Sequence, residues 1–126
     1  MHGLAPHSVL EIGCANGWRL AEIKRRHPDT QCTGCDVSFA ALSDGRRKWP
    51  GIKLFYSQAT QLRYAERDQF DLVIMGFFLY LCSREDLFQI VAEADRVLKD
   101  SGHLIIYDFA APDDGIISAH YEHDHR

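Results

Sequence analysis

The sequence lacks several features that would place a protein in a large functional class. It contains no run of about 18 apolar residues, which a transmembrane helix requires, and no basic N-terminal segment followed by an apolar one. It also lacks an excess of basic residues, since 14 Lys and Arg stand against 18 Asp and Glu. These absences predict a cytoplasmic protein that binds neither membrane nor nucleic acid.

Cysteines are few, and only one pair has the spacing of a metal or redox motif. Cys32 and Cys35 form a C-x-x-C sequence, whereas Cys14 and Cys82 have no such neighbour. Residues 31–36 read as a strand, in which side chains alternate between faces, so the two thiols of the pair should point in opposite directions. We therefore predict no metal site among the cysteines, since small buried thiols are common in protein cores.

Short apolar runs alternate with helical periodicity along the chain, whose 126 residues suit one domain. Strands are predicted at residues 8–12, 31–36, 52–56, 70–75 and 103–109. Helices are predicted from residue 18 to about 27, from Ser38 to Pro50, and from Ser83 to Gly102. Strands that alternate with helices predict an α/β fold, with a doubly wound, mostly parallel sheet of the Rossmann-like type.

The first predicted strand runs directly into a segment bounded by Gly13 and Gly17. Glycines allow a ligand to approach the backbone closely, and the helix that follows directs unpaired N–H groups at it. In doubly wound sheets, ligands bind beyond the carboxyl ends of the strands. Asp36, about 20 residues further on at the end of the second strand, suits a carboxylate that accepts hydrogen bonds from ribose hydroxyls.

Two common nucleotide-binding motifs do not match this segment. A P-loop ends in Gly-Lys-Ser/Thr, whereas Trp18 and Arg19 follow Gly17. A dinucleotide-binding G-x-G-x-x-G would need glycine in place of both Ala15 and Trp18. An oxidoreductase with a nucleotide cofactor is therefore the less favoured alternative.

The segment 9–17, VLEIGCANG, resembles the first motif of the class I S-adenosylmethionine-dependent methyltransferases, with Ala15 in place of the usual middle glycine. Asp36, the pair at 58–59, the run at 70–80 and the segment 96–108 follow in the order of the later motifs of that family. The resemblance covers residues 8–108. It implies a strand order of 3-2-1-4-5, and S-adenosylmethionine as a cofactor that the reaction converts to S-adenosylhomocysteine.

The resemblance also implies which residues contact the cofactor. Asp36 would bind the ribose, and Glu11 would lie near the amino group. Gln58 stands where the family usually has an acidic residue, and its amide oxygen can still accept a hydrogen bond from the adenine amino group. The full set of implied cofactor residues is Glu11, Gly13, Cys14, Ala15, Gly17, Asp36, Val37, Gln58, Ala59, Gly76 and Phe77.

The methyl acceptor is expected to lie beyond the fourth and fifth strands. Asp108, Tyr80 and His120 are candidate general bases, although an aromatic residue such as Tyr80 more often serves in packing. Enzymes that methylate nucleobase amines usually carry Asn/Asp-Pro-Pro-aromatic after the fourth strand, where this chain has Gly76 and Phe77. We therefore expect a small-molecule acceptor. The alternative is a module that binds S-adenosylmethionine without catalysis.

Residues 110–126 are expected to form a polar tail, and its histidines a solvated segment rather than a metal site. The sheet of the family continues with two more strands after the fifth, for which this tail is too short. We therefore expect one cofactor-binding domain over residues 1–126, truncated at its C-terminus and lacking the last two strands. The fifth strand would then be an exposed edge through which the protein could self-associate.

Overall fold

The computed structural model describes residues 5–76, 82–109 and 116–122. Strands and helices alternate through most of this length. In chain order the elements are β1 (Ser8–Ile12), α1 (Trp18–Arg26), β2 (Gln31–Asp36), α2 (Phe39–Lys48), β3 (Lys53–Tyr56), β4 (Phe70–Gly76), α3 (Arg84–Val97), β5 (Leu98–Phe109) and β6 (Ile116–Glu122).

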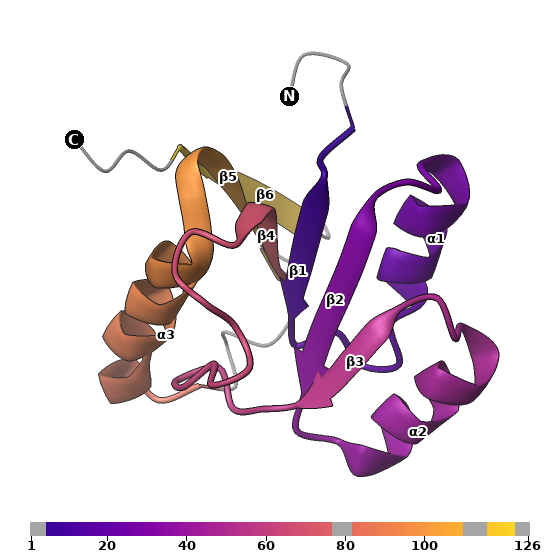
Figure 1. Cartoon of the computed structure of the whole chain (residues 1–126). Helices are drawn as coiled ribbons and strands as arrows, with labels where there is room; N and C mark the ends of the chain where they lie inside the picture. The colour runs from indigo at the N-terminus through magenta and orange to yellow at the C-terminus, as the bar shows by residue number, and fades with distance from the viewer. Residues whose placement is uncertain (1–4, 77–81, 110–115, 123–126) are drawn as a thin grey trace.

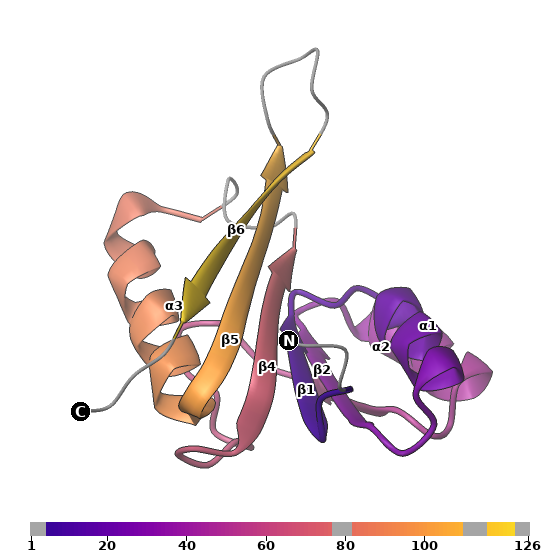
Figure 2. The same cartoon turned by 90° about the horizontal axis from the view of Figure 1, so that it is seen from above.

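The six strands form one sheet in the order β3-β2-β1-β4-β5-β6. The first five are parallel, and β6 is antiparallel to β5. Helices α1 and α2 lie against one face of the sheet and α3 against the other (Figures 1 and 2). This arrangement confirms the predicted doubly wound sheet with strand order 3-2-1-4-5. The winding reverses between β1 and β4, which is where such sheets bind ligands.

The core consists of two apolar clusters, one on each face of the sheet. The cluster on the α3 side contains Leu10, Phe70 and Cys35, and the cluster on the side of α1 and α2 contains Val9 and Cys32. Cys32 and Cys35 therefore point to opposite faces, as the alternation of side chains in a strand predicts. No group of three or more His, Cys, Asp or Glu side chains among the described residues could hold a metal ion.

Side-chain caps are present at the predicted starts of two helices. The Ser38 Oγ accepts a hydrogen bond from the Ala41 N–H at 3.1 Å, and the Ser83 Oγ accepts one from the Asp86 N–H at 3.3 Å. The third helix ends at Val97 rather than near Gly102, because Leu98 is fully buried and already pairs with Phe70 of β4. Strand β5 therefore begins earlier than the sequence predicts.

Strand β6 corrects the expectation for the C-terminal residues. Residues 116–122 do not form a polar tail, since they pair with β5 from Phe109 opposite Ile116 to His103 opposite Glu122. The expectation considered only a helix followed by two strands, whereas one antiparallel strand needs far fewer residues. The segment also contains Ile116, Ile117 and Tyr121, residue types that favour strands. The described edge of β5 is covered, so the predicted self-association through that edge loses its basis.

Within the described residues, no helix has the length and apolar character needed to cross a membrane.

Candidate functional site

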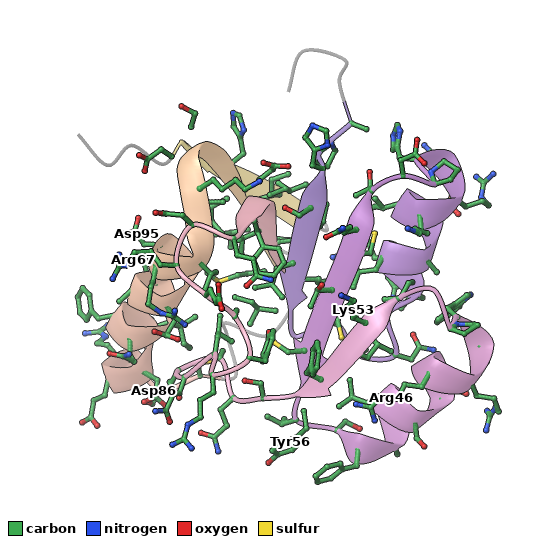
Figure 3. The ribbon with its side chains drawn as sticks, viewed as in Figure 1. Arg46, Lys53, Tyr56, Arg67, Asp86 and Asp95 are labelled. Atoms are coloured by element: carbon green, nitrogen blue, oxygen red, sulfur yellow. The ribbon has the colours of Figure 1, made fainter. Side chains whose placement is uncertain are left out.

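A cavity of about 640 Å³ opens at the carboxyl ends of β1, β2 and β4. Asp86 at the beginning of α3 and Tyr56 at the end of β3 both lie toward this end of the sheet (Figure 3). The expected cofactor residues that line the cavity are Glu11, Gly13, Cys14, Ala15, Asp36, Val37, Gln58, Ala59 and Gly76. The further lining residues are Ile12, Trp18, Arg19, Ser57, Thr60, Cys82, Asp86 and Ile90.

The loop between β1 and α1 forms the floor of the cavity in an unusual backbone conformation. Gly13, Ala15 and Gly17 all have positive φ, at 76°, 53° and 89°. For Ala15 this left-handed conformation is costly, by roughly 1 kcal/mol, because its Cβ crowds the backbone. The N–H groups of Gly13 and Cys14 both donate to the Cys35 carbonyl at 2.9 Å, which fixes the loop to the end of β2.

The Asp36 carboxylate connects this loop to the beginning of α2. One carboxylate oxygen accepts from the Ala15 N–H at 2.8 Å, and the other accepts from the Ser38 N–H at 2.9 Å. The first of these bonds helps to hold Ala15 in its strained conformation. An ionised carboxylate has about four lone-pair sites, so Asp36 can still accept hydrogen bonds from a ligand.

Helix α2 packs against the loop between β1 and α1. The Asn16 side-chain amide donates to Asp44 at 2.9 Å. Gly45, which disfavours a helix by its propensity, is buried against the Asn16 carbonyl, and a Cβ at this position would clash with that oxygen. The glycine within the helix therefore allows α2 to approach the loop closely.

Glu11 is a buried carboxylate at the end of β1, with only 3% of its surface exposed. Its Oε2 accepts a hydrogen bond from the Arg19 Nη1 at 2.9 Å, whereas its Oε1 is buried without a hydrogen-bond partner. The pKa of Glu11 is raised to about 7, chiefly because the carboxylate is buried; the Arg19 guanidinium lowers the pKa and the nearby Asp36 raises it, and this value includes both effects. The unpartnered oxygen is a position where a ligand donor would be strongly favoured.

Arg19 was missed as a site residue by the sequence analysis, which used it only to exclude a P-loop. Its guanidinium lies 5.0 Å from the centre of the Trp18 ring and 5.1 Å from that of the Tyr107 ring. A Cβ on Gly76 would lie 2.6 Å from the Arg19 Nη1. The sequence shows only that a basic residue, Arg19, follows shortly after a strand that carries Glu11 near its end. This pattern does not reveal the contact between the two side chains.

The loop between β3 and β4 forms the opposite wall and is attached to α3. The Leu62 N–H donates to Glu93 at 2.7 Å, and the Leu62 carbonyl accepts from Arg96 at 2.9 Å. The Gln89 side chain donates to the Thr60 carbonyl at 3.2 Å. These bonds hold the segment that contains Gln58 and Ala59 against the cavity.

The remaining expected site residues are Gly17, Phe77, Tyr80, Asp108 and His120. Gly17 caps α1 and does not line the cavity. Phe77 and Tyr80 fall outside the described residues. The backbone of Asp108 follows Tyr107, the partner of Gly76 at the cavity end of β5, whereas the backbone of His120 lies opposite Ile105, further back along that strand.

Known proteins that resemble this chain indicate the family to which it belongs. A family model described as a methyltransferase domain matches residues 9–102. Malonyl-[acyl-carrier protein] O-methyltransferase of Legionella pneumophila is 31% identical over 108 residues, which cover 81% of this chain and 36% of that protein. Demethylmenaquinone methyltransferase of Listeria welshimeri is 30% identical over 111 residues, which cover 83% of this chain and 46% of that protein.

A solved structure shares the fold. The amino pentose methyltransferase from Micromonospora echinaspora, determined with S-adenosylmethionine bound, has a TM-score of 0.73 and 23% identity over 86% of this chain and 45% of its own. The chain thus spans less than half the length of these relatives. It belongs to the class I S-adenosylmethionine-dependent methyltransferases, a family whose cofactor is S-adenosylmethionine.

Proposed function

We propose that the cavity binds S-adenosylmethionine and that the protein transfers its methyl group to a small-molecule acceptor. The observation that carries this proposal is the buried Oε1 of Glu11, which lines the cavity without a hydrogen-bond partner. An unpaired buried carboxylate oxygen is costly, and the amino group of the cofactor would supply the missing donor. The neighbouring glycine loop leaves the backbone open to a close approach.

The other lining residues fit the adenosine part of the cofactor. Asp36 would accept hydrogen bonds from the ribose hydroxyls while keeping those from Ala15 and Ser38. The Gln58 amide oxygen would accept from the adenine amino group, and Val37 offers an apolar surface to the ring. Gly13 and Cys14 would provide backbone beside the methionine part.

The chain itself contributes mainly position and enclosure to the reaction. When bound, the cofactor supplies a methyl group on a sulfonium, which is a good leaving group. The protein must align the acceptor atom and exclude water. For an acceptor that loses a proton, we propose Asp108 as general base, because its backbone stands at the cavity end of β5. Tyr80 and His120 remain the second choices.

A small acceptor is supported by the names of the relatives. The names of the compared proteins refer to a malonyl group on a carrier protein, to demethylmenaquinone and to an amino pentose. In addition, the sequence lacks the segment that usually follows the fourth strand in enzymes acting on nucleobase amines.

Binding can be tested by titration calorimetry with S-adenosylhomocysteine and with NAD. We expect S-adenosylhomocysteine to bind and NAD to give no signal, and we expect Glu11→Gln to weaken the former. Binding of NAD alone would contradict the proposal and favour an oxidoreductase.

Transfer can be tested with methyl-labelled S-adenosylmethionine and a panel of carboxylic acids, quinols and amino sugars, with nucleic acid and protein as comparison acceptors. We expect label to appear in a small molecule, and Asp108→Asn to slow transfer to an acceptor that must lose a proton. Binding of the cofactor without transfer to any member of the panel would instead indicate a non-catalytic module.

A further inference from the structure

The charges around the cavity are unequal. Among the described residues that line it, Glu11, Asp36 and Asp86 carry carboxylates, and Arg19 is the one cationic side chain. S-adenosylmethionine carries two positive groups, the sulfonium and the ammonium, and a single carboxylate. An acidic cavity suits the net positive charge of this cofactor, but its carboxylate requires a cationic partner.

We propose that Arg19 binds the α-carboxylate of the methionine part of the cofactor. The neighbouring amino group of the cofactor would donate its hydrogen bond to Glu11. This inference rests on the proposed function and assigns a specific role to a residue that the sequence motifs do not include. The amino group and the carboxylate of an α-amino acid are attached to the same carbon. They therefore need two adjacent protein groups of opposite charge.

Glu11 and Arg19 form such a pair. The Glu11 Oε2 and the Arg19 Nη1 are 2.9 Å apart, and the second oxygen of Glu11 has no hydrogen-bond partner. A guanidinium carries five N–H donors in a planar fork, and the bond from the Arg19 Nη1 to Glu11 uses one of them. The pair can thus receive both ends of the amino acid together.

The surroundings keep the guanidinium at this position. The rings of Trp18 and Tyr107 lie about 5 Å from it, at the distance of cation–π contacts. Gly76 leaves the space that the guanidinium occupies, since a Cβ there would lie 2.6 Å from Nη1. An arginine fixed in this way loses little side-chain entropy when it binds a carboxylate.

A purely structural role for Arg19, as the counter-ion of Glu11, makes a different prediction. In that case the loss of Arg19 would disturb the fold of the cavity and lower the affinity for every ligand, whether or not the ligand carries a carboxylate. A role in carboxylate binding affects only ligands that carry the carboxylate. The two roles can therefore be separated by ligands that differ in this one group.

The test measures, by calorimetry, the affinity of the full chain for three probes. S-adenosylhomocysteine has both the amino group and the carboxylate, its decarboxylated analogue keeps only the amino group, and 5′-methylthioadenosine has neither. We expect Arg19→Met to reduce the preference for S-adenosylhomocysteine over the decarboxylated analogue by roughly tenfold to a hundredfold, the usual value of a charged hydrogen bond. Arg19→Lys should reduce it less, because lysine keeps the charge without the fork.

Two controls make the outcome decisive. Arg25→Met alters an exposed arginine of the same helix that pairs with Glu22, and it should leave all three affinities unchanged. The affinity for 5′-methylthioadenosine reports whether each variant keeps a folded cavity. An unchanged preference in both Arg19 variants, with 5′-methylthioadenosine still bound, would overturn the inference alone. Failure of the unmodified chain to bind any of the probes would overturn the proposed function itself.

Discussion

Asp36 is the residue that connects the glycine loop to the beginning of α2, through its bonds to Ala15 and Ser38. We expect Asp36→Ala to lower the affinity for S-adenosylhomocysteine by about 1.5 to 3 kcal/mol, because hydrogen bonds to a charged group have this value. Asp36→Asn should lose less, since it keeps one acceptor oxygen. Calorimetry provides the measurement, with Asp29→Ala at an exposed position as the control. Unchanged affinity in folded Asp36→Ala protein would exclude this role.

Glu11 should make the stability of the protein depend on pH. Burial raises its pKa to about 7 from the usual 4.5, so the folded protein holds this proton through a pH range in which the unfolded chain has lost it. The free energy of unfolding should therefore fall as pH rises from about 4.5 to 7 and then level off. The size of this fall should be on the order of 3 kcal/mol, since one pKa unit corresponds to about 1.4 kcal/mol.

Glu11→Gln should remove this component of the pH dependence. The measurement is urea unfolding at several pH values, with the exposed Glu66→Gln as a control that keeps the profile of the unmodified protein. If Glu11→Gln and the unmodified protein show parallel profiles between pH 4.5 and 7, the carboxylate does not hold a proton in the folded state.

At the scale of elements, the approach of α2 to the glycine loop depends on Gly45. Alanine is the better helix former by about 1 kcal/mol, so propensity alone predicts that Gly45→Ala stabilises the protein. We expect the opposite, a loss of about 1 to 3 kcal/mol, because the new Cβ meets the Asn16 carbonyl and the Leu54 side chain. Affinity for S-adenosylhomocysteine should fall as well, since the loop must move.

Gly51→Ala is the matched control for this prediction. A Cβ at Gly51 meets nothing within 4 Å, so its substitution should change the free energy of unfolding by well under ~1 kcal/mol. Urea unfolding of the two variants compares the positions directly. A more stable Gly45→Ala protein with unchanged affinity would show that the loop and α2 can separate without cost.

For the whole molecule, strand β6 covers the side of β5 that faces away from β4. Removal of residues 111–126 takes away the strand that pairs with β5, and it leaves the β5 backbone without those partners. We expect the shortened protein to self-associate in light scattering and to lose roughly 1 kcal/mol of stability or more. Residues 123–126 follow β6 in the sequence, so their removal alone should change neither the self-association nor the stability of the protein. A monomeric and equally stable shortened protein would contradict the role given to β6.

Much of this protein is determined by the sequence alone. Short apolar runs, helical periodicity and the caps at Ser38 and Ser83 are local signals, and they yielded the order of elements and the α/β class. The glycine segment and Asp36 could also be located, because in a parallel sheet every strand end points to the same edge. The alternation of side chains along β2 placed Cys32 and Cys35 on opposite faces.

The tertiary structure alone decided the features that depend on contacts between distant residues. The bond between Glu11 and Arg19, the contact of Gly45 with the Asn16 carbonyl, and the pairing of β6 with β5 have no local signature in the sequence. Each depends on how closely two packed elements approach, and side-chain periodicity carries no information about that distance. The sequence therefore determined which edge of the sheet holds the site, and packing determined which charges line it.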